Sequence, residues 1–269
     1  MKPLIHFAHA NGFPSASYHA LFDALSTDYD VCQLPLSGHH PDYPVTDNWP
    51  FLKQQLIDSI EAQCDRPVIG VGHSLGGGLT MMAARERPDL FESIILLDVP
   101  LFSCLESLLV RAVKHFGLVD AVTPAGRSKR RRTQWPDAQT ALDYFRTRGL
   151  FQRFDERCLR DYVDSAIRPS HDGGVELAYE LEVELAIFRS MPHTLAVRAG
   201  QLAMPAGIVV GRDTDTVRKS QYLRMKRRLG FVGERIEGTH MFPLEYPEQT
   251  AAAISRQWLQ MQQAQQQVS

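Results

Sequence analysis

Short apolar runs alternate with longer amphipathic stretches over the first hundred residues and again near the C-terminus. The apolar runs predict strands at 3–8, 29–34, 67–71, 93–97, 206–210 and 233–236. The amphipathic stretches predict helices at 17–25, 50–64, 75–86 and 247–261. Strands that alternate with helices favour an α/β fold, here a mostly parallel central sheet of about six strands with helices on both faces.

Residues 100–202 interrupt this alternation. They contain many charges, no clear buried strand, and helical patterns at 105–116, 137–148 and 156–167. We therefore expect an inserted helical cap. The predicted segments are a first part of the core at 1–99, the cap at 100–202 and a second part of the core at 203–269.

Composition excludes several classes of protein. The chain of 269 residues is 44% apolar and 22% charged, which is typical of a globular protein, and its net charge of −2 gives no electrostatic reason to bind nucleic acid. No apolar run approaches the roughly 18 residues of a membrane span, and no signal-peptide pattern is visible. The four cysteines lie far apart, without metal-ligand spacing. We expect a cytoplasmic protein with no metal and no membrane span; its oligomeric state is not indicated.

The segment Gly72–Gly76 has the form Gly-x-Ser-x-Gly, with Ser74 at its centre. It follows the apolar run 68–71 directly and precedes an amphipathic stretch that begins at Leu75. A sharp turn between a strand and a helix exposes a serine hydroxyl at the helix N-terminus, where the helix dipole favours developing negative charge. Ser74 is therefore the candidate nucleophile.

A serine hydroxyl is a weak nucleophile and needs a neighbouring base. His240 is the candidate, because it lies in a loop between the last predicted strand and the final helix. His73, next to the candidate nucleophile, is expected to pack rather than to act in the chemistry.

The base in turn needs a carboxylate that orients it and stabilises its charged form. Asp215 is preferred, because the turn after the strand 206–210 must extend before a side chain reaches the histidine loop. Asp213 in the same turn is the second candidate. Asp98, directly after the strand 93–97, is the third.

Acyl transfer also requires donors for the oxyanion. The backbone N–H of Leu75 is one expected donor. The second is expected from the loop 9–14, where small residues let the backbone approach a substrate. Asn11 is the first choice there and Phe13 the second.

Taken together, these motifs resemble the α/β-hydrolase superfamily. The matching segments, in chain order, are His9–Gly12, Leu34–His39, Gly72–Gly76, Leu97-Asp98, Gly211–Asp215 and Gly238–His240. The loop at His9 lies so close to the N-terminus that the first strands of the superfamily's sheet are expected to be missing. The position of the insertion matches that of the superfamily's helical cap.

The resemblance implies a serine hydrolase of the carboxylesterase type, because relatives that use an aspartate nucleophile would not have Ser74. It implies cleavage of an ester or related acyl bond in a small to medium apolar molecule through an acyl-enzyme, without a cofactor. The alternatives are a C–C bond hydrolase or a cofactor-free perhydrolase on the same residues, or a ligand-binding member of the fold without catalysis.

Aromatic side chains of the cap could line an apolar chamber over the nucleophile. The candidates for this substrate pocket are Trp135, Tyr144, Phe145, Phe151 and Phe188. The basic run 127–132 could meet an anionic group of a substrate, but a solvated or mobile loop is the preferred interpretation.

Overall fold

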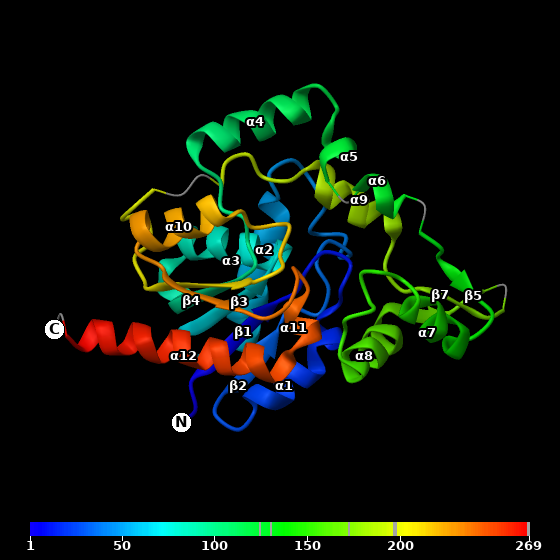
Figure 1. Cartoon of the computed structure of the whole chain (residues 1–269), viewed down its shortest axis with the longest axis horizontal. Coiled ribbons are helices and arrows are strands. Elements are labelled where there is room, and N and C mark those ends of the chain that lie inside the picture. Colours follow the sequence, from blue (N-terminus) through cyan, green and yellow to red (C-terminus); the bar gives the residue numbers. More distant parts are fainter. Residues whose placement is uncertain (124, 130, 172, 196–197, 268–269) are drawn as a thin grey trace.

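Six strands form one parallel sheet at the centre of the molecule (Figure 1). The computed structural model describes residues 1–123, 125–129, 131–171, 173–195 and 198–267. The strands, in spatial order, are β2 (Asp30–Gln33), β1 (Leu4–Ala8), β3 (Val68–His73), β4 (Phe91–Leu97), β8 (Ala206–Gly211) and β9 (Val232–Ile236). Every neighbouring pair is parallel, which confirms the expected sheet.

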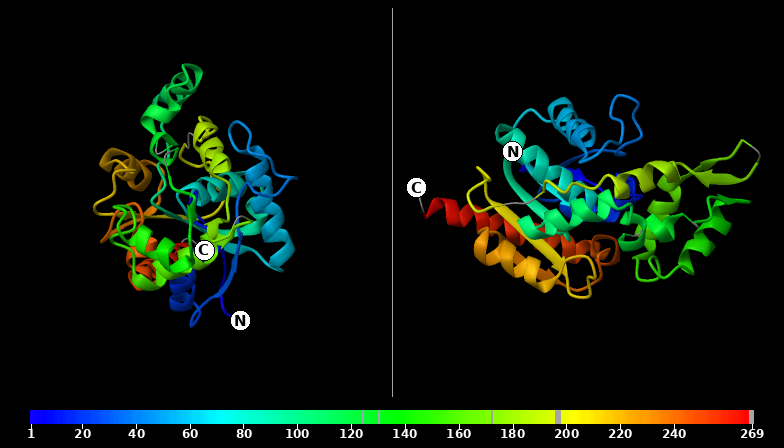
Figure 2. Two further views of the ribbon diagram at one scale, coloured as in Figure 1. Left: turned by 90° about the vertical axis from the view of Figure 1, so that its right-hand side faces the viewer. Right: turned by 90° about the horizontal axis from the view of Figure 1, so that it is seen from above.

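Helices cover both faces of this sheet (Figures 1 and 2). One layer holds α2 (Pro50–Gln63), α3 (Leu75–Glu86) and α10 (Lys219–Arg228), and the other holds α1 (His19–Leu25) and α12 (Pro247–Gln266). Short 3-10 turns lie at Ser15–Tyr18 and Pro88–Leu90, and a short helix, α11, at Phe242–Glu245.

Alternate residues of the central strands supply two separate cores. In β1, Ile5 and Phe7 join the cluster under α1 and α12, whereas Leu4 and Ala8 join the cluster under α2 and α3. A strand that is buried on both faces is apolar along most of its length, so it gives the continuous runs seen in the sequence. α10 escaped prediction because its sequence is strongly polar and only Gln221 and Met225 are buried.

The chain between β4 and β8 leaves the sheet; its first helix lies at the top of Figure 1, and the rest of the segment forms the extension on the right. Its elements are α4 (Cys104–His115), α5 (Val119–Val122), α6 (Ala125–Ser128), β5 (Gln134–Trp135), α7 (Ala138–Arg146), α8 (Glu156–Ala166), β6 (Ile167–Pro169), β7 (Val175–Leu177) and α9 (Leu181–Arg189). We call this segment the cap; its division from the core at residues 100 and 202 stays a prediction.

The cap also contains strands, which the sequence pattern does not predict. β5, β7 and β6 form a small antiparallel sheet. Each of these strands is only two or three residues long, so none of them produces the apolar run by which a buried strand is recognised.

Candidate active site

Ser74 stands in the turn between β3 and α3 with a strained backbone. Its φ of 53° and ψ of −113° lie outside the regions that residues with a side chain ordinarily occupy. The flanking glycines permit the turn: a Cβ at Gly72 would lie 2.5 Å from the backbone of Gly76, and a Cβ at Gly76 would lie 2.1 Å from the carbonyl oxygen of Ala8. The Ser74 side chain is partly exposed, so a ligand can reach it.

Three side chains that are distant in the sequence meet at the carboxyl ends of the strands. The Ser74 hydroxyl donates to Nε2 of His240 at 3.0 Å, and Nδ1 of His240 donates to Oδ2 of Asp98 at 2.8 Å. His240 lies between β9 and α11, and Asp98 is the residue directly after β4. The carboxylate thus holds the imidazole in the tautomer whose Nε2 can accept the serine proton.

Asp98 is fully buried, and donors at the end of β8 and in the turn after it bind its carboxylate. Its Oδ1 accepts the N–H of Gly211 at 3.0 Å, and its Oδ2 accepts the hydroxyl of Thr214 at 2.5 Å in addition to His240. A carboxylate with no solvent exposure requires such partners. They fix its orientation toward the imidazole.

The preference for Asp215 is therefore wrong, and so is the second choice, Asp213. Asp215 is exposed, and its side chain accepts from the hydroxyl of Thr216 at 3.3 Å. Asp213 is also exposed and forms an ion pair with Arg153 at 3.0 Å. The turn after β8 does reach the histidine loop, but it contributes hydrogen-bond donors to Asp98 instead of a carboxylate.

The expected oxyanion donors differ in their surroundings. Leu75 is the first residue of α3, so its N–H has no acceptor within the helix. The N–H of Phe13 donates to the carbonyl of Ala10 at 3.1 Å, so that alternative is already engaged in a turn. The side chain of Asn11 donates to the carbonyl of Glu184 in α9 at 3.0 Å. The backbone amides of Leu75 and Asn11 stay our predicted donors.

Arg131, in the basic run 127–132, is not solvated as the preferred interpretation of that run expects. Its guanidinium binds the buried carboxylate of Glu184 at 2.8 and 3.1 Å and the hydroxyl of Tyr179 at 2.5 Å. Arg130 lies outside the described residues. The carboxylate of Glu184 also lies where a Cβ on Gly12 would be 3.2 Å away, so this pair joins the cap to the loop after β1. A charge run alone could not reveal this, because its partner is more than fifty residues away.

Three of the predicted pocket residues belong to a buried aromatic cluster, in which the ring of Phe151 also lies 5.9 Å from that of Phe13 in the loop after β1. Trp135, Phe145 and Phe151 are buried, with ring centroids 5.2 Å apart in the first pair and 4.8 Å in the second. Tyr144 and Phe188 are half-buried, and for all five residues a role in lining a substrate pocket stays a prediction.

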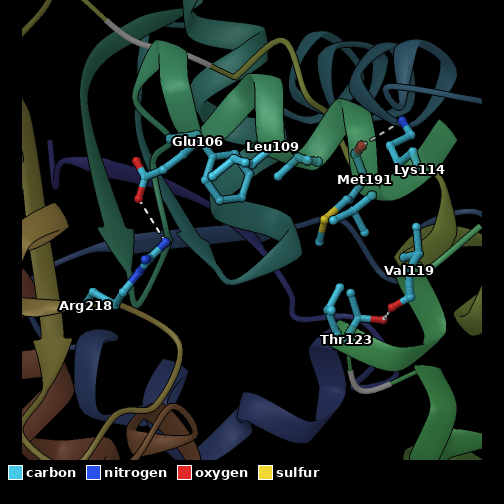
Figure 3. Close-up of a pocket in the computed structure, with 11 residues that line it drawn as sticks. Glu106, Leu109, Lys114, Val119, Thr123, Met191 and Arg218 are labelled. Atoms are coloured by element: carbon cyan, nitrogen blue, oxygen red, sulfur yellow. Dashed lines mark hydrogen bonds and ion pairs between the residues drawn. The ribbon is translucent and has the colours of Figure 1, made fainter. Parts of the chain in front are cut away.

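A cavity of about 140 Å³ lies beneath α4, and its described lining includes none of the five predicted aromatic residues. Figure 3 shows the ion pair of Glu106 and Arg218 at one end, Val119 and Thr123 at the other, and Met191 between them. Among the described residues that line it, none is Ser74, His240 or Asp98.

Residues 7–253 match the model of the alpha/beta hydrolase family. The chain belongs to this family. The parallel sheet and the serine turn are therefore those of an alpha/beta hydrolase core, and the cap is an insertion between β4 and β8.

Two curated relatives match part of this alpha/beta hydrolase. A type I acyl-CoA thioesterase of Penicillium brevicompactum is 28% identical over 167 residues, which cover 56% of this chain and 36% of that protein. The esterase YbfF of Escherichia coli (strain K12) is 27% identical over 101 residues, which cover 33% of this chain and 39% of that protein. The chain thus spans less than two fifths of the length of these relatives.

Solved structures show the same fold over nearly the whole chain. E-2-(acetamidomethylene)succinate hydrolase superposes with a TM-score of 0.76 at 22% identity, covering 96% of this chain and 91% of that one. The thioesterase domain from the curacin biosynthetic pathway superposes with a TM-score of 0.69 at 18% identity, covering 94% and 90%.

Two further properties concern the described part of the chain. Within it, no group of three or more histidine, cysteine, aspartate or glutamate side chains is placed to hold a metal ion. No helix among the described residues is both long and apolar enough to cross a membrane.

Proposed function

We propose that this protein is a serine hydrolase that cleaves an ester or thioester bond of a small to medium acyl compound. Ser74 is the nucleophile, His240 the general base, and Asp98 the carboxylate that orients the base. The observation that carries this proposal is the pair of consecutive hydrogen bonds of 3.0 and 2.8 Å that joins the three side chains.

The first half of the cycle forms an acyl-enzyme. Oγ of Ser74 attacks the carbonyl carbon while its proton passes to Nε2 of His240, and the buried charge of Asp98 stabilises the imidazolium. The amides of Leu75 and Asn11 bind the oxyanion. His240 then returns its proton to the departing alcohol or thiol as the bond to the carbonyl carbon breaks.

The second half regenerates the free serine. Water attacks the acyl-enzyme and gives its proton to Nε2 of His240, and the Ser74 oxygen leaves with that proton as the acid is released. Neither half requires a metal or an organic cofactor.

The relatives support the acyl chemistry but not a particular substrate. One is named a thioesterase and the other an esterase, so oxygen and sulfur leaving groups are both in scope. C–C cleavage, perhydrolysis and binding without turnover are the competing functions that an assay must separate.

The test is a panel of p-nitrophenyl esters and acyl thioesters of increasing chain length, with a vinylogous diketone and hydrogen peroxide as separate arms. Ser74→Ala and His240→Ala should each lower kcat by at least about 10⁴-fold, because members of such a unit fail together. Ser26→Ala, a change to an exposed serine, is the matched control. Turnover by Ser74→Ala that equals the control, or turnover of only the diketone, contradicts the proposal.

A further inference from the structure

His73 precedes the nucleophile in the chain and is wholly buried. Its Nδ1 lies 2.8 Å from the hydroxyl of Tyr18, and its Nε2 lies 2.9 Å from the main-chain oxygen of His240. The hydroxyl of Tyr18 lies 3.3 Å from the main-chain nitrogen of Ala10. A single polar chain therefore links the loop after β1, the serine turn and the histidine loop.

The positions of the hydrogens in this row of hydrogen bonds follow from the groups at its two ends, the carbonyl of His240 and the N–H of Ala10. A carbonyl oxygen can only accept, so Nε2 of His73 carries the hydrogen that it shares with His240. A neutral imidazole has one such hydrogen, so its Nδ1 accepts and the Tyr18 hydroxyl donates to it. The Tyr18 oxygen is then free to accept the N–H of Ala10.

The surroundings of His73 keep it neutral. Burial lowers its pKa well below the ordinary value of 6.5, and the nearby rings of His240 and His9 lower it further. The centroid of the His240 ring is 5.1 Å from that of His73, and His240 is itself bonded to the carboxylate of Asp98. A neutral His73 donates to the histidine loop without placing a second positive charge beside the base.

We propose that His73 and Tyr18 are positioning residues for the hydrolytic site. By holding the carbonyl of His240 and the N–H of Ala10, they set the distance between the imidazole and the Ser74 hydroxyl and fix the loop that contains Asn11. This inference rests on the proposed function. It differs from a packing role, because a packing role needs only the ring of residue 18, whereas the polar chain needs its hydroxyl.

Tyr18→Phe separates the two roles, because it keeps the ring and removes the hydroxyl. Tyr29→Phe is the matched control: it removes the hydroxyl of another buried tyrosine, outside the polar chain. A displacement of about 1 Å can cost on the order of 100-fold in rate, so we expect Tyr18→Phe to lower kcat about 10- to 100-fold, with KM within about twofold. The rate at which a fluorophosphonate acylates Ser74 should fall by a similar factor.

Two outcomes of this experiment have separate meanings. If the native protein is labelled at Ser74 and Tyr18→Phe is labelled as fast as Tyr29→Phe, the positioning role is refuted and the proposed function stands. If the native protein is not labelled at all, the proposed function itself fails.

A second measurement uses the native chain and does not depend on the folding of a variant. Long-range ¹H–¹⁵N correlation spectra of protein labelled with ¹⁵N-histidine report which ring nitrogen carries the hydrogen. We expect His73 as a neutral ring protonated at Nε2 between about pH 6 and 8, where an ordinary imidazole changes its charge; comparison with His73→Gln assigns the signal. A hydrogen on Nδ1 of His73 in that range overturns the inference.

Discussion

Replacing Asp98 by asparagine changes the hydrogen-bond chemistry of the site with little change of shape. In the native protein Oδ2 of Asp98 accepts from both Thr214 and His240, while Oδ1 accepts from Gly211. An asparagine whose oxygen keeps the Gly211 bond turns an NH2 group toward His240. That group can only donate, so Nδ1 of His240 must accept and Nε2 must carry the hydrogen.

The expected loss follows from this reversal of the tautomer. With its hydrogen on Nε2, His240 cannot take the proton of Ser74, and the imidazolium loses the buried charge that stabilises it. The equivalent change in another Ser-His-Asp enzyme lowers kcat about 10⁴-fold, and we expect Asp98→Asn to lower kcat about 10³- to 10⁴-fold. The affinity for substrate should change little, because Asp98 is buried behind His240.

The assay compares kcat and KM for a p-nitrophenyl ester across Asp98→Asn, Asp215→Asn and Asp213→Asn. The two exposed aspartates serve as matched controls, and we expect each control variant to retain activity within about threefold of the native protein, since a surface charge contributes little. Circular dichroism checks that the variants are folded. A nearly native Asp98→Asn, or an Asp215→Asn that loses activity, refutes this account of the site.

Two further predictions concern the fold that holds the site. Burial lowers the pKa values of His6 and His9 from 6.5 to about 4. Between these pH values the unfolded protein binds more protons than the folded protein, so the free energy of unfolding should fall as pH falls. The expected fall is up to about 4 kcal/mol for the two groups between pH 7 and 5. Urea unfolding at the two pH values measures this change, to which His73 also adds because burial lowers its pKa. His6→Gln should reduce the change by about 2 kcal/mol, and a change of native size in that variant contradicts the assignment. Gly76→Ala should destabilise the protein by at least about 2 kcal/mol, because its Cβ would lie 2.1 Å from a backbone oxygen. Gly149→Ala, which meets no atom within 4 Å, should be nearly neutral, and equal unfolding midpoints for the two alanine variants contradict the close approach.

The sequence predicted the parts of the site whose signal is local. Ser74 lies where a strand meets a helix, and β3 and α3 form at the expected residues because the apolar runs on either side of the turn are unambiguous. His240 follows β9 as expected. The side chains that contact Ser74 and His240 come from distant parts of the sequence. The elements that place Ser74 and His240 themselves are formed by residues next to them in the sequence, so they could be predicted.

The features of the site and the cap that could not be predicted correctly depend on contacts between residues that are distant in the sequence. Asp98 adopts a φ of 52°, which directs its carboxylate toward the histidine loop. No pattern of residues in the sequence predicts this backbone conformation. Its position directly after the strand next to β3 made Asp98 the third candidate, but no sequence pattern placed it ahead of Asp215. The burial of Arg131 and the packing of Trp135 inside the cap likewise depend on partners that the local sequence does not identify.

The most direct test of the central claim is the site at which a fluorophosphonate reacts. The folded native protein should gain one covalent adduct, and peptide mapping by mass spectrometry should locate it on Ser74. The adduct should be absent from Ser74→Ala and from native protein unfolded before the reagent is added, because the nucleophile exists only when His240 and Asp98 are held beside it. No adduct on the folded protein, or an adduct that persists in Ser74→Ala, would contradict the account.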